Sequence, residues 1–255
     1  MCSSCFSAAG IRLTLPLPAR PVSGLRLLCR ALADFLLPPA CFGCDREVDA
    51  GLVCADCLRK LGSSAPGCCP ACGRPVFGGA GHAQHCRASS IARTRVLGPY
   101  APPFSSLVHA LKYEDKTALA RPLGDALSAL VESDPELARA DCVCPVPLHP
   151  ARLRERGYNQ SELLAREVAS STGKEFLDLL VRKKNTPTQT RKMDHVERRQ
   201  NLKGAFVARP VMGATGRTVI IVDDVTTSGA TLDAAGRRLL LEGATALFGL
   251  AVAGV

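Results

Sequence analysis

The stretch that most constrains the fold is residues 218–232, where a hydrophobic run, two acids and a hydroxyl-rich loop follow one another. The four residues from Val219 to Val222 are all β-branched, which predicts a strand buried on both faces of a parallel sheet. Asp223 and Asp224 come at the point where this strand would leave the sheet, and a helical pattern runs from Leu232 to Leu241. The stretch therefore predicts a strand, a turn and a helix of an α/β fold.

Small and hydroxyl-bearing residues connect the acids to the helix: Thr226, Thr227, Ser228, Gly229, Ala230 and Thr231. A loop of this kind at a helix N-terminus presents main-chain N–H groups and the positive end of the helix dipole, which predicts a phosphate cradle. Two carboxylates beside it would repel the phosphate unless they face sugar hydroxyls or a magnesium ion. A phosphate next to a diol indicates a ribose 5-phosphate.

This stretch has two alternative interpretations. A buried strand can end in a polar turn whose acids are solvated or cap a helix. An apolar strand followed by two acids also occurs as the Walker B element of nucleotide hydrolases, but the chain contains neither a Walker A loop nor a G-x-G-x-x-G motif.

The net charge of +9 indicates an anionic partner, and both nucleic acid and a polyphosphate substrate suit it. Aromatic residues make up 4% of the chain and tryptophan is absent, so the composition does not indicate a platform for stacking single-stranded bases. Arginines interrupt each apolar run near the N-terminus, and no apolar stretch approaches the ~18 residues that span a membrane. We expect a cytoplasmic protein without membrane insertion.

Eight of the thirteen cysteines lie between residues 41 and 86, which is typical of metal ligation in a reducing compartment. The first four form two C-x-x-C pairs separated by nine residues: Cys41, Cys44, Cys54 and Cys57. Two such knuckles are the pattern of a four-thiolate zinc ribbon. A redox dithiol is the main alternative, but it would lie on a helix of a βαβ unit, which this segment does not contain.

A second cluster follows and predicts a second zinc ion. Cys69 and Cys72 form another knuckle, Cys86 is a further ligand, and His82 or His85 would be the fourth. The two histidines remain alternatives, because either ring can supply a ligand nitrogen.

The domain organisation expected from these patterns is a disordered leader over 1–24, a helix plus double zinc-ribbon domain over 25–90, and an α/β domain over 91–255. The helix of the second segment should cover 25–37, before a Pro-Pro pair. In the third segment we expect strands at 94–100, 141–147, 176–181, 205–207 and 245–252, and helices at 104–113, 118–131 and 161–171, the last capped by Asn159.

Positive charge is concentrated in two segments of the third domain. A turn after residue 147 carries His149, Arg152 and other arginines, which would be either a binding loop or a solvated basic surface. Residues 182–203 hold eight basic residues and two acids, a net +6 of the chain's +9. A long polar insertion between strands is usually functional or disordered.

These motifs together resemble the ComF family of double-zinc-ribbon phosphoribosyltransferases, over roughly residues 25–255. Besides the cysteines, the resemblance rests on residues 110–113, 145–150, 154–160, 186–189, 197–201, 205–206 and 222–231. The second ribbon departs from the family, because histidines precede Cys86 where a C-x-x-C pair would be expected.

The resemblance implies a type I phosphoribosyltransferase fold, a parallel sheet flanked by helices with ligands at the carboxyl ends of the strands. Asp223 and Asp224 would then hold the ribose of phosphoribosyl pyrophosphate (PRPP) or of a phosphoribosylated nucleotide, with or without Mg²⁺, and residues 226–231 its 5-phosphate. The pyrophosphate loop would comprise Val146, Pro147, Leu148 and His149. The flexible loop would lie at 186–203 and contribute Gln189, Arg198 and Asn201.

The resemblance also implies a link to DNA uptake in natural competence, with an acceptor substrate that is not settled. The alternative function is a non-enzymatic adaptor, whose zinc ribbons and basic face would bind single-stranded DNA or a competence helicase.

Overall fold

A computed structural model describes residues 39–62, 69, 89–185, 202, 204–209 and 213–255. Residues 39–255 form one compact unit. The leader expected at 1–24 and the helix expected at 25–37 lie outside the described residues.

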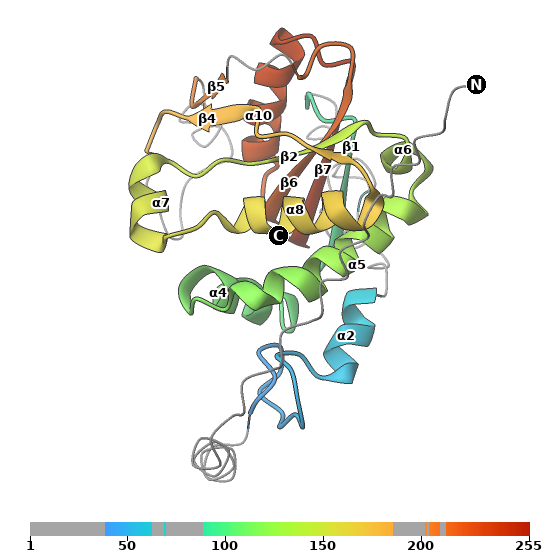
Figure 1. The fold of residues 1–255 in the computed structure, drawn as a ribbon, viewed down its shortest axis with the longest axis vertical. Coiled ribbons are helices and arrows are strands. Elements are labelled where there is room, and N and C mark those ends of the chain that lie inside the picture. Colours follow the sequence, from blue (N-terminus) through green and yellow to red (C-terminus); the bar gives the residue numbers. More distant parts are fainter. Residues whose placement is uncertain (1–38, 63–68, 70–88, 186–201, 203, 210–212) are drawn as a thin grey trace, which may run out of the picture. The chain divides into compact units, whose positions relative to one another are not determined.

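The centre of the fold is a five-stranded parallel sheet with the order β1-β7-β6-β2-β3 (Figure 1). Its strands are β1 (Arg93–Pro99), β2 (Cys142–Pro145), β3 (Glu175–Phe176), β6 (Thr218–Thr226) and β7 (Ala246–Gly254). The predicted parallel sheet flanked by helices is therefore confirmed. Strand β6 is central, because Val222 is in register with Pro145 of β2 on one side and Leu250 of β7 on the other.

The apolar run of β6 is buried on both faces of the sheet, as predicted. Ile220 and Val222 belong to one hydrophobic core, and Val219 and Ile221 to the other. This alternation follows from the pleat of a strand, which points successive side chains to opposite faces. The strand also extends further than expected, since Asp223 and Asp224 lie within it and not after it.

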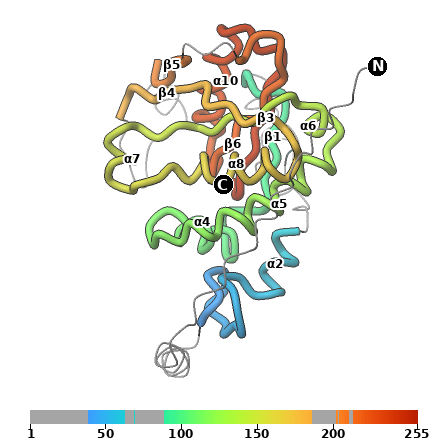
Figure 2. The backbone as a smooth tube through the Cα atoms, in the orientation of Figure 1, coloured from blue at the N-terminus to red at the C-terminus, as the bar shows by residue number. Residues whose placement is uncertain are grey.

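Helices cover both faces of the sheet (Figures 1 and 2). The first core is closed by helices from the middle of the chain: α4 (Phe104–Tyr113), α5 (Ala120–Ser133) and α8 (Gln160–Thr172). The second core is closed by α10 (Ala230–Leu241), through Leu232, Ala235 and Leu239. The described residues also contain shorter helices: α2 (Ala55–Gly62), η2 (Thr117–Leu119), α6 (Pro135–Ala138) and α7 (Pro150–Arg156).

Two predicted elements are wrong. The strand expected at 176–181 is two strands in different sheets, because the chain leaves the parallel sheet after Phe176 and places Leu179 and Leu180 in the second core. Residue Leu180 begins β4 (Leu180–Arg182), which pairs antiparallel with β5 (Phe206–Ala208). The basic turn after residue 147 contains helix α7, for which Pro150 supplies the first residue and the ring of His149 the N-cap.

The described residues contain no helix with both the length and the apolar character required to cross a membrane.

Candidate ligand cavity and metal centre

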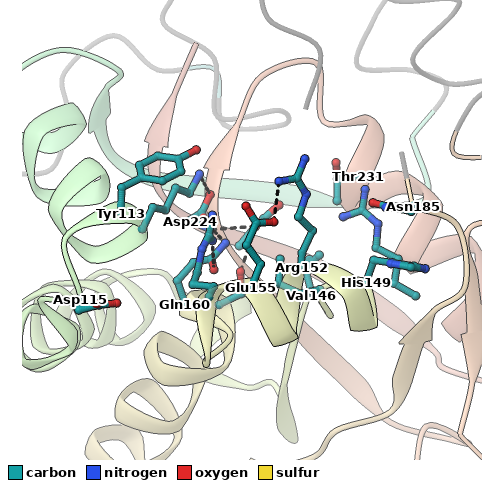
Figure 3. A pocket seen from close by; sticks show the side chains of 16 residues that line it. Tyr113, Asp115, Val146, His149, Arg152, Glu155, Gln160, Asn185, Asp224 and Thr231 are labelled. Atoms are coloured by element: carbon teal, nitrogen blue, oxygen red, sulfur yellow. Dashed lines mark hydrogen bonds and ion pairs between the residues drawn. The ribbon is translucent and has the colours of Figure 1, made fainter. Parts of the chain in front are cut away.

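A cavity of about 550 Å³ opens at the carboxyl ends of β2 and β6. This edge of a parallel sheet is where α/β folds bind their ligands. The cavity is lined by residues of seven elements or of the segments that follow them: Lys112, Tyr113, Asp115, Val146, Leu148, His149, Arg152, Glu155, Arg156, Gln160, Ser161, Arg182, Asn185, Asp223, Asp224 and Thr231. Figure 3 shows Tyr113 and Asp224 toward one side of the cavity, and His149, Asn185 and Thr231 toward the other.

The turn after β2 is fixed to helix α8 by Asn159. The Asn159 side chain caps α8 by accepting a hydrogen bond from the Ser161 amide (3.1 Å), as the sequence predicts. The same side chain donates to the Val146 carbonyl (3.0 Å). Because one buried amide serves both segments, the turn at 146–149 and the first residues of α8 hold a fixed position on the cavity.

The two acids of β6 have different surroundings. Asp224 is 3% exposed, pairs with the Lys112 ammonium (2.6 Å) and accepts a hydrogen bond from the Gln160 side-chain amide (2.5 Å). Asp223 accepts hydrogen bonds from the Ser161 hydroxyl (3.1 Å) and from the Asp224 main-chain amide (2.9 Å). A carboxylate pair at the end of a strand therefore faces the cavity, with one cation from α4 beside it.

Burial raises the pKa of Asp223 to about 7, and the negative charge of Asp224 adds to the rise, while Lys112 acts in the opposite direction. Burial acts to lower the pKa of Lys112, but the charge of Asp224 and its hydrogen bond outweigh burial, so that this pKa is raised. Burial also lowers the pKa of the Arg182 guanidinium, against the charge of Asp223. The cavity thus holds partly buried groups of both signs, an arrangement that is frequent at functional sites.

We predict that the stability of the protein depends on Asp223 between pH 4 and pH 7. The folded-state pKa of about 7 exceeds the ordinary value of 3.8, so the folded state retains a proton that the unfolded state releases over this interval. The contribution of Asp223 to the free energy of unfolding therefore falls as the pH rises from about 4 to about 7. Asp223→Asn cannot ionise, so the variant should gain stability relative to the natural protein as the pH rises. Urea denaturation at several pH values checks this, and a constant difference between the two proteins would contradict it.

The loop between β6 and α10 is the predicted phosphate cradle. The N-cap of α10 is Gly229, whose φ of 71° lies in the left-handed region that glycine adopts without strain. The Thr226 side chain is 3% exposed, and its hydroxyl has no hydrogen-bond partner among the described residues. The first amides of this twelve-residue helix and the buried Thr226 hydroxyl are donors from which a phosphate oxygen can accept, although the Ala230 amide also donates to the Ser228 hydroxyl (3.4 Å).

The structure brings several of the proposed site residues together on the cavity: Val146, Leu148, His149, Asp223, Asp224 and Thr231. Pro147 and residues 226–230 do not line it. The flexible-loop residues Gln189, Arg198 and Asn201 lie outside the described residues.

Lys112, Gln160, Ser161 and Arg182 line the cavity but were not among the predicted site residues. Lys112 and Gln160 lie in two of the blocks that carry the family resemblance, 110–113 and 154–160. That coincidence is the one signal in the sequence that could have indicated them.

The second candidate site is formed by Cys41, Cys44, Cys54 and Cys57, whose sulfur atoms all lie within 4.8 Å of one another. Cys44 Sγ and Cys54 Sγ are 3.6 Å apart, and a tetrahedral zinc site with Zn–S bonds of about 2.3 Å has S–S edges of about 3.8 Å. The amides of Gly43 and Cys54 donate to Cys41 Sγ, at 3.3 and 3.2 Å. The hydrogen bond from the Cys57 amide contributes most to lowering the pKa of Cys54 to about 7. The predicted four-thiolate cluster is confirmed, and its donor set fits zinc.

The zinc knuckles pack into the first hydrophobic core. Cys41 and Cys57 are 0% and 1% exposed, and they belong to the same buried cluster as Phe104 and Leu107 of α4. A Cβ atom at Gly43 would lie 2.9 Å from both Cys57 Sγ and Pro103 Cβ, so the first knuckle has room only for glycine there. The metal site therefore packs directly against α4, the helix that carries Lys112.

The second zinc site stays a prediction, because most of its expected ligands lie outside the described residues. Cys69 is partly buried, and Cys72, His82, His85 and Cys86 lie outside the described residues.

Comparison with known proteins assigns both regions. Residues 32–89 match the double zinc ribbon domain, and residues 159–253 match the phosphoribosyl transferase domain. Competence protein F of Haemophilus influenzae is 31% identical over 206 residues, which cover 73% of this chain and 90% of the relative. DNA utilization protein YhgH of Escherichia coli K12 is 30% identical, covering 83% and 95%, and competence protein ComFC of Bacillus subtilis is 28% identical, covering 76% and 80%.

Proposed function

Because the chain belongs to the ComF family, which joins a double zinc ribbon to a phosphoribosyltransferase domain, we propose that its cavity binds PRPP or a phosphoribosylated nucleotide. The observation that carries the proposal is one cavity lined by Asp223, Asp224, Thr231 and the turn around His149. The names of the relatives, which refer to competence and DNA utilization, support a role for this activity in DNA uptake.

In this proposal each part of the ligand meets groups of suitable chemistry. The ribose hydroxyls donate to carboxylate oxygens at the end of β6, and the 5-phosphate accepts from the amides and hydroxyls of residues 226–231. The pyrophosphate lies against the 146–149 turn, where Arg152 faces the cavity. Arg152 pairs with the exposed Glu155 (2.9 Å). In this proposal the pyrophosphate replaces Glu155 as the anionic partner of the arginine.

The reaction would be displacement of pyrophosphate from the anomeric carbon through an oxocarbenium-like state, and an acceptor base takes its place. The chain's own residues would bind and orient the sugar, and Arg152 would neutralise the leaving group. The family resemblance would add Arg198 and closure of the 186–203 loop against water, although Arg198 lies outside the described residues. Mg²⁺ bound to the pyrophosphate would supply further charge neutralisation. No described residue is assigned as a general base.

Thermal unfolding with added PRPP tests the proposal. A ligand present at 100 times its dissociation constant stabilises the folded state by about 2.7 kcal/mol, so PRPP should raise Tm by several degrees. Ribose 5-phosphate should raise it less, because it lacks the pyrophosphate. Release of pyrophosphate in the presence of a panel of nitrogenous bases then tests transfer. The absence of a shift with PRPP would contradict binding, and a shift without pyrophosphate release would assign a binding protein.

A second candidate function is an adaptor that binds single-stranded DNA or a competence helicase, and an exposed tyrosine together with a partly buried phenylalanine of the first zinc knuckle favours it. A second cavity of about 440 Å³ is lined by Phe42, Tyr100 and His109 together with Asp45 and Glu114. Tyr100 is 47% exposed, and the Lys116 ammonium lies 5.2 Å from the Phe42 ring centroid. Aromatic faces stack on bases, whereas the two acids repel phosphates. DNA binding with a steep salt dependence that PRPP leaves unchanged would favour the adaptor, and competition by PRPP would favour a single site.

A further inference from the structure

Both carboxylate oxygens of Asp224 are already engaged within the protein. Oδ1 lies 2.6 Å from the Lys112 ammonium, and Oδ2 accepts a hydrogen bond from Gln160 Nε2 at 2.5 Å. The orientation of the Gln160 amide is fixed, because its Oε1 accepts from the Arg156 guanidinium (2.5 Å). A divalent cation at Asp224 would have to displace an ammonium ion from a carboxylate that is 3% exposed.

The neighbouring acid differs in this respect. Among the described residues, hydrogen bonds reach Asp223 at Oδ1 alone, from the Ser161 hydroxyl and the Asp224 amide. Its second oxygen is an acceptor that a ligand hydroxyl can use, and the side chain lines the cavity. The twin acids are therefore not equivalent: Asp223 offers an oxygen to a ligand, and Asp224 holds a lysine.

Helix α4 holds Lys112 firmly at this position. The preceding residue, Leu111, is fully buried in the first core, and its carbonyl accepts a hydrogen bond from the Tyr158 hydroxyl (2.5 Å). The Lys112 side chain is 19% exposed and lines the cavity. An ammonium has three donors, and among the described residues Asp224 is the ion-pair partner of this one, so two donors remain for ligand oxygens. Figure 3 shows Asp224, the acidic partner of Lys112, at the side of the cavity that carries Tyr113.

We propose that Lys112 is a built-in cation of the ligand site, whose ammonium replaces a divalent metal ion at Asp224 and binds the ribose or phosphate oxygens of PRPP directly. This inference rests on the proposed function, and it assigns unequal roles to the two acids. Asp223 accepts from a ribose hydroxyl, and Asp224 holds the Lys112 ammonium in position to donate to ligand oxygens. Binding of PRPP at this end of the cavity then needs no Mg²⁺.

Calorimetric titration of PRPP into the zinc-loaded full chain tests the inference, with and without added Mg²⁺ in a buffer free of other divalent ions. The natural protein should bind PRPP in both conditions. Lys112→Met should weaken binding roughly tenfold or more without Mg²⁺, since a charge-assisted contact is lost, and Mg²⁺ should restore it by occupying the vacated carboxylate. Lys116→Met is the matched control, four residues along the chain and outside the cavity, and should bind as the natural protein does.

The double variant Lys112→Met with Asp224→Asn keeps the test valid if the single variant unfolds, because it leaves no buried carboxylate without a partner. It should bind weakly and show no rescue by Mg²⁺. Equal affinity of Lys112→Met and the natural protein without Mg²⁺ would overturn the inference, and so would a loss that Mg²⁺ does not rescue while the variant is folded. Failure of the natural protein to bind PRPP in either condition would instead overturn the proposed function.

Discussion

Cys57→Ser is expected to remove about one zinc ion per chain and to lower the thermal stability of the whole compact unit. Structural zinc in small peptides contributes roughly 10–16 kcal/mol of apparent binding energy, and replacing one thiolate forfeits much of it. Cys57 is 1% exposed and packs in the same core as Leu107 of α4, so loosening of the knuckle should reach that helix. Metal analysis of the purified protein and a thermal scan measure both effects.

Cys142→Ala is the matched control for this prediction. Cys142 is fully buried in the second core, on β2, and is not part of the four-sulfur cluster. The control should lose stability through the cavity that it creates and keep its full zinc content. Unchanged zinc content in Cys57→Ser would show that the described knuckles are not the metal site.

The combined replacement of Asp223 and Asp224 by asparagine is expected to lower PRPP affinity by roughly 100-fold or more. The charged acceptor that Asp223 offers to a ribose hydroxyl is lost, and the loss of Asp224 disturbs the ammonium that contacts the ligand. Hydrogen bonds to charged groups contribute about 1.5–3 kcal/mol each. The variant also leaves Lys112 without its carboxylate, although asparagine has nearly the same size and shape as aspartate and keeps the packing against Gln160. Calorimetric titration gives the affinity directly.

Asp125→Asn controls for the change of charge, because Asp125 is an exposed residue of α5 that does not line the cavity. Its affinity for PRPP should match that of the natural protein. Zinc content should be the same in all three proteins, since the knuckles supply no ligand to the cavity. Retention of tight binding by the doubly substituted protein would place PRPP elsewhere.

Much of the fold could be predicted because its signals are local. The β-branched run of β6 dictates burial on both faces, and the helix at 104–113 has the bounds that its apolar spacing indicates. Asn159 is a side-chain cap whose chemistry can be read from its position before an apolar helix. The cluster of four cysteines could be predicted because two C-x-x-C pairs at this spacing are the pattern of a tetrahedral zinc site.

The rest depends on contacts between distant parts of the chain. Gln160 and Asp224 are 64 positions apart, and Lys112 comes from a helix on another segment, so no periodicity brings the three together. Residues 176–181 are largely apolar, yet two hydrophobic cores compete for them and the strand divides. The proline at position 150 led to the prediction of a turn. Helix α7 forms there because a proline is well accommodated at the first position of a helix.

Hydrogen–deuterium exchange of the main-chain amides, with and without PRPP, is the most direct test that the loop between β6 and α10 holds a sugar phosphate. A bound 5-phosphate accepts hydrogen bonds from these amides and should slow their exchange at residues 227–231. The Cys41–Cys57 knuckles should exchange at the same rate in both conditions. Exchange at 227–231 that PRPP leaves unchanged, under conditions where PRPP is bound, would contradict the assignment of this loop as the phosphate site.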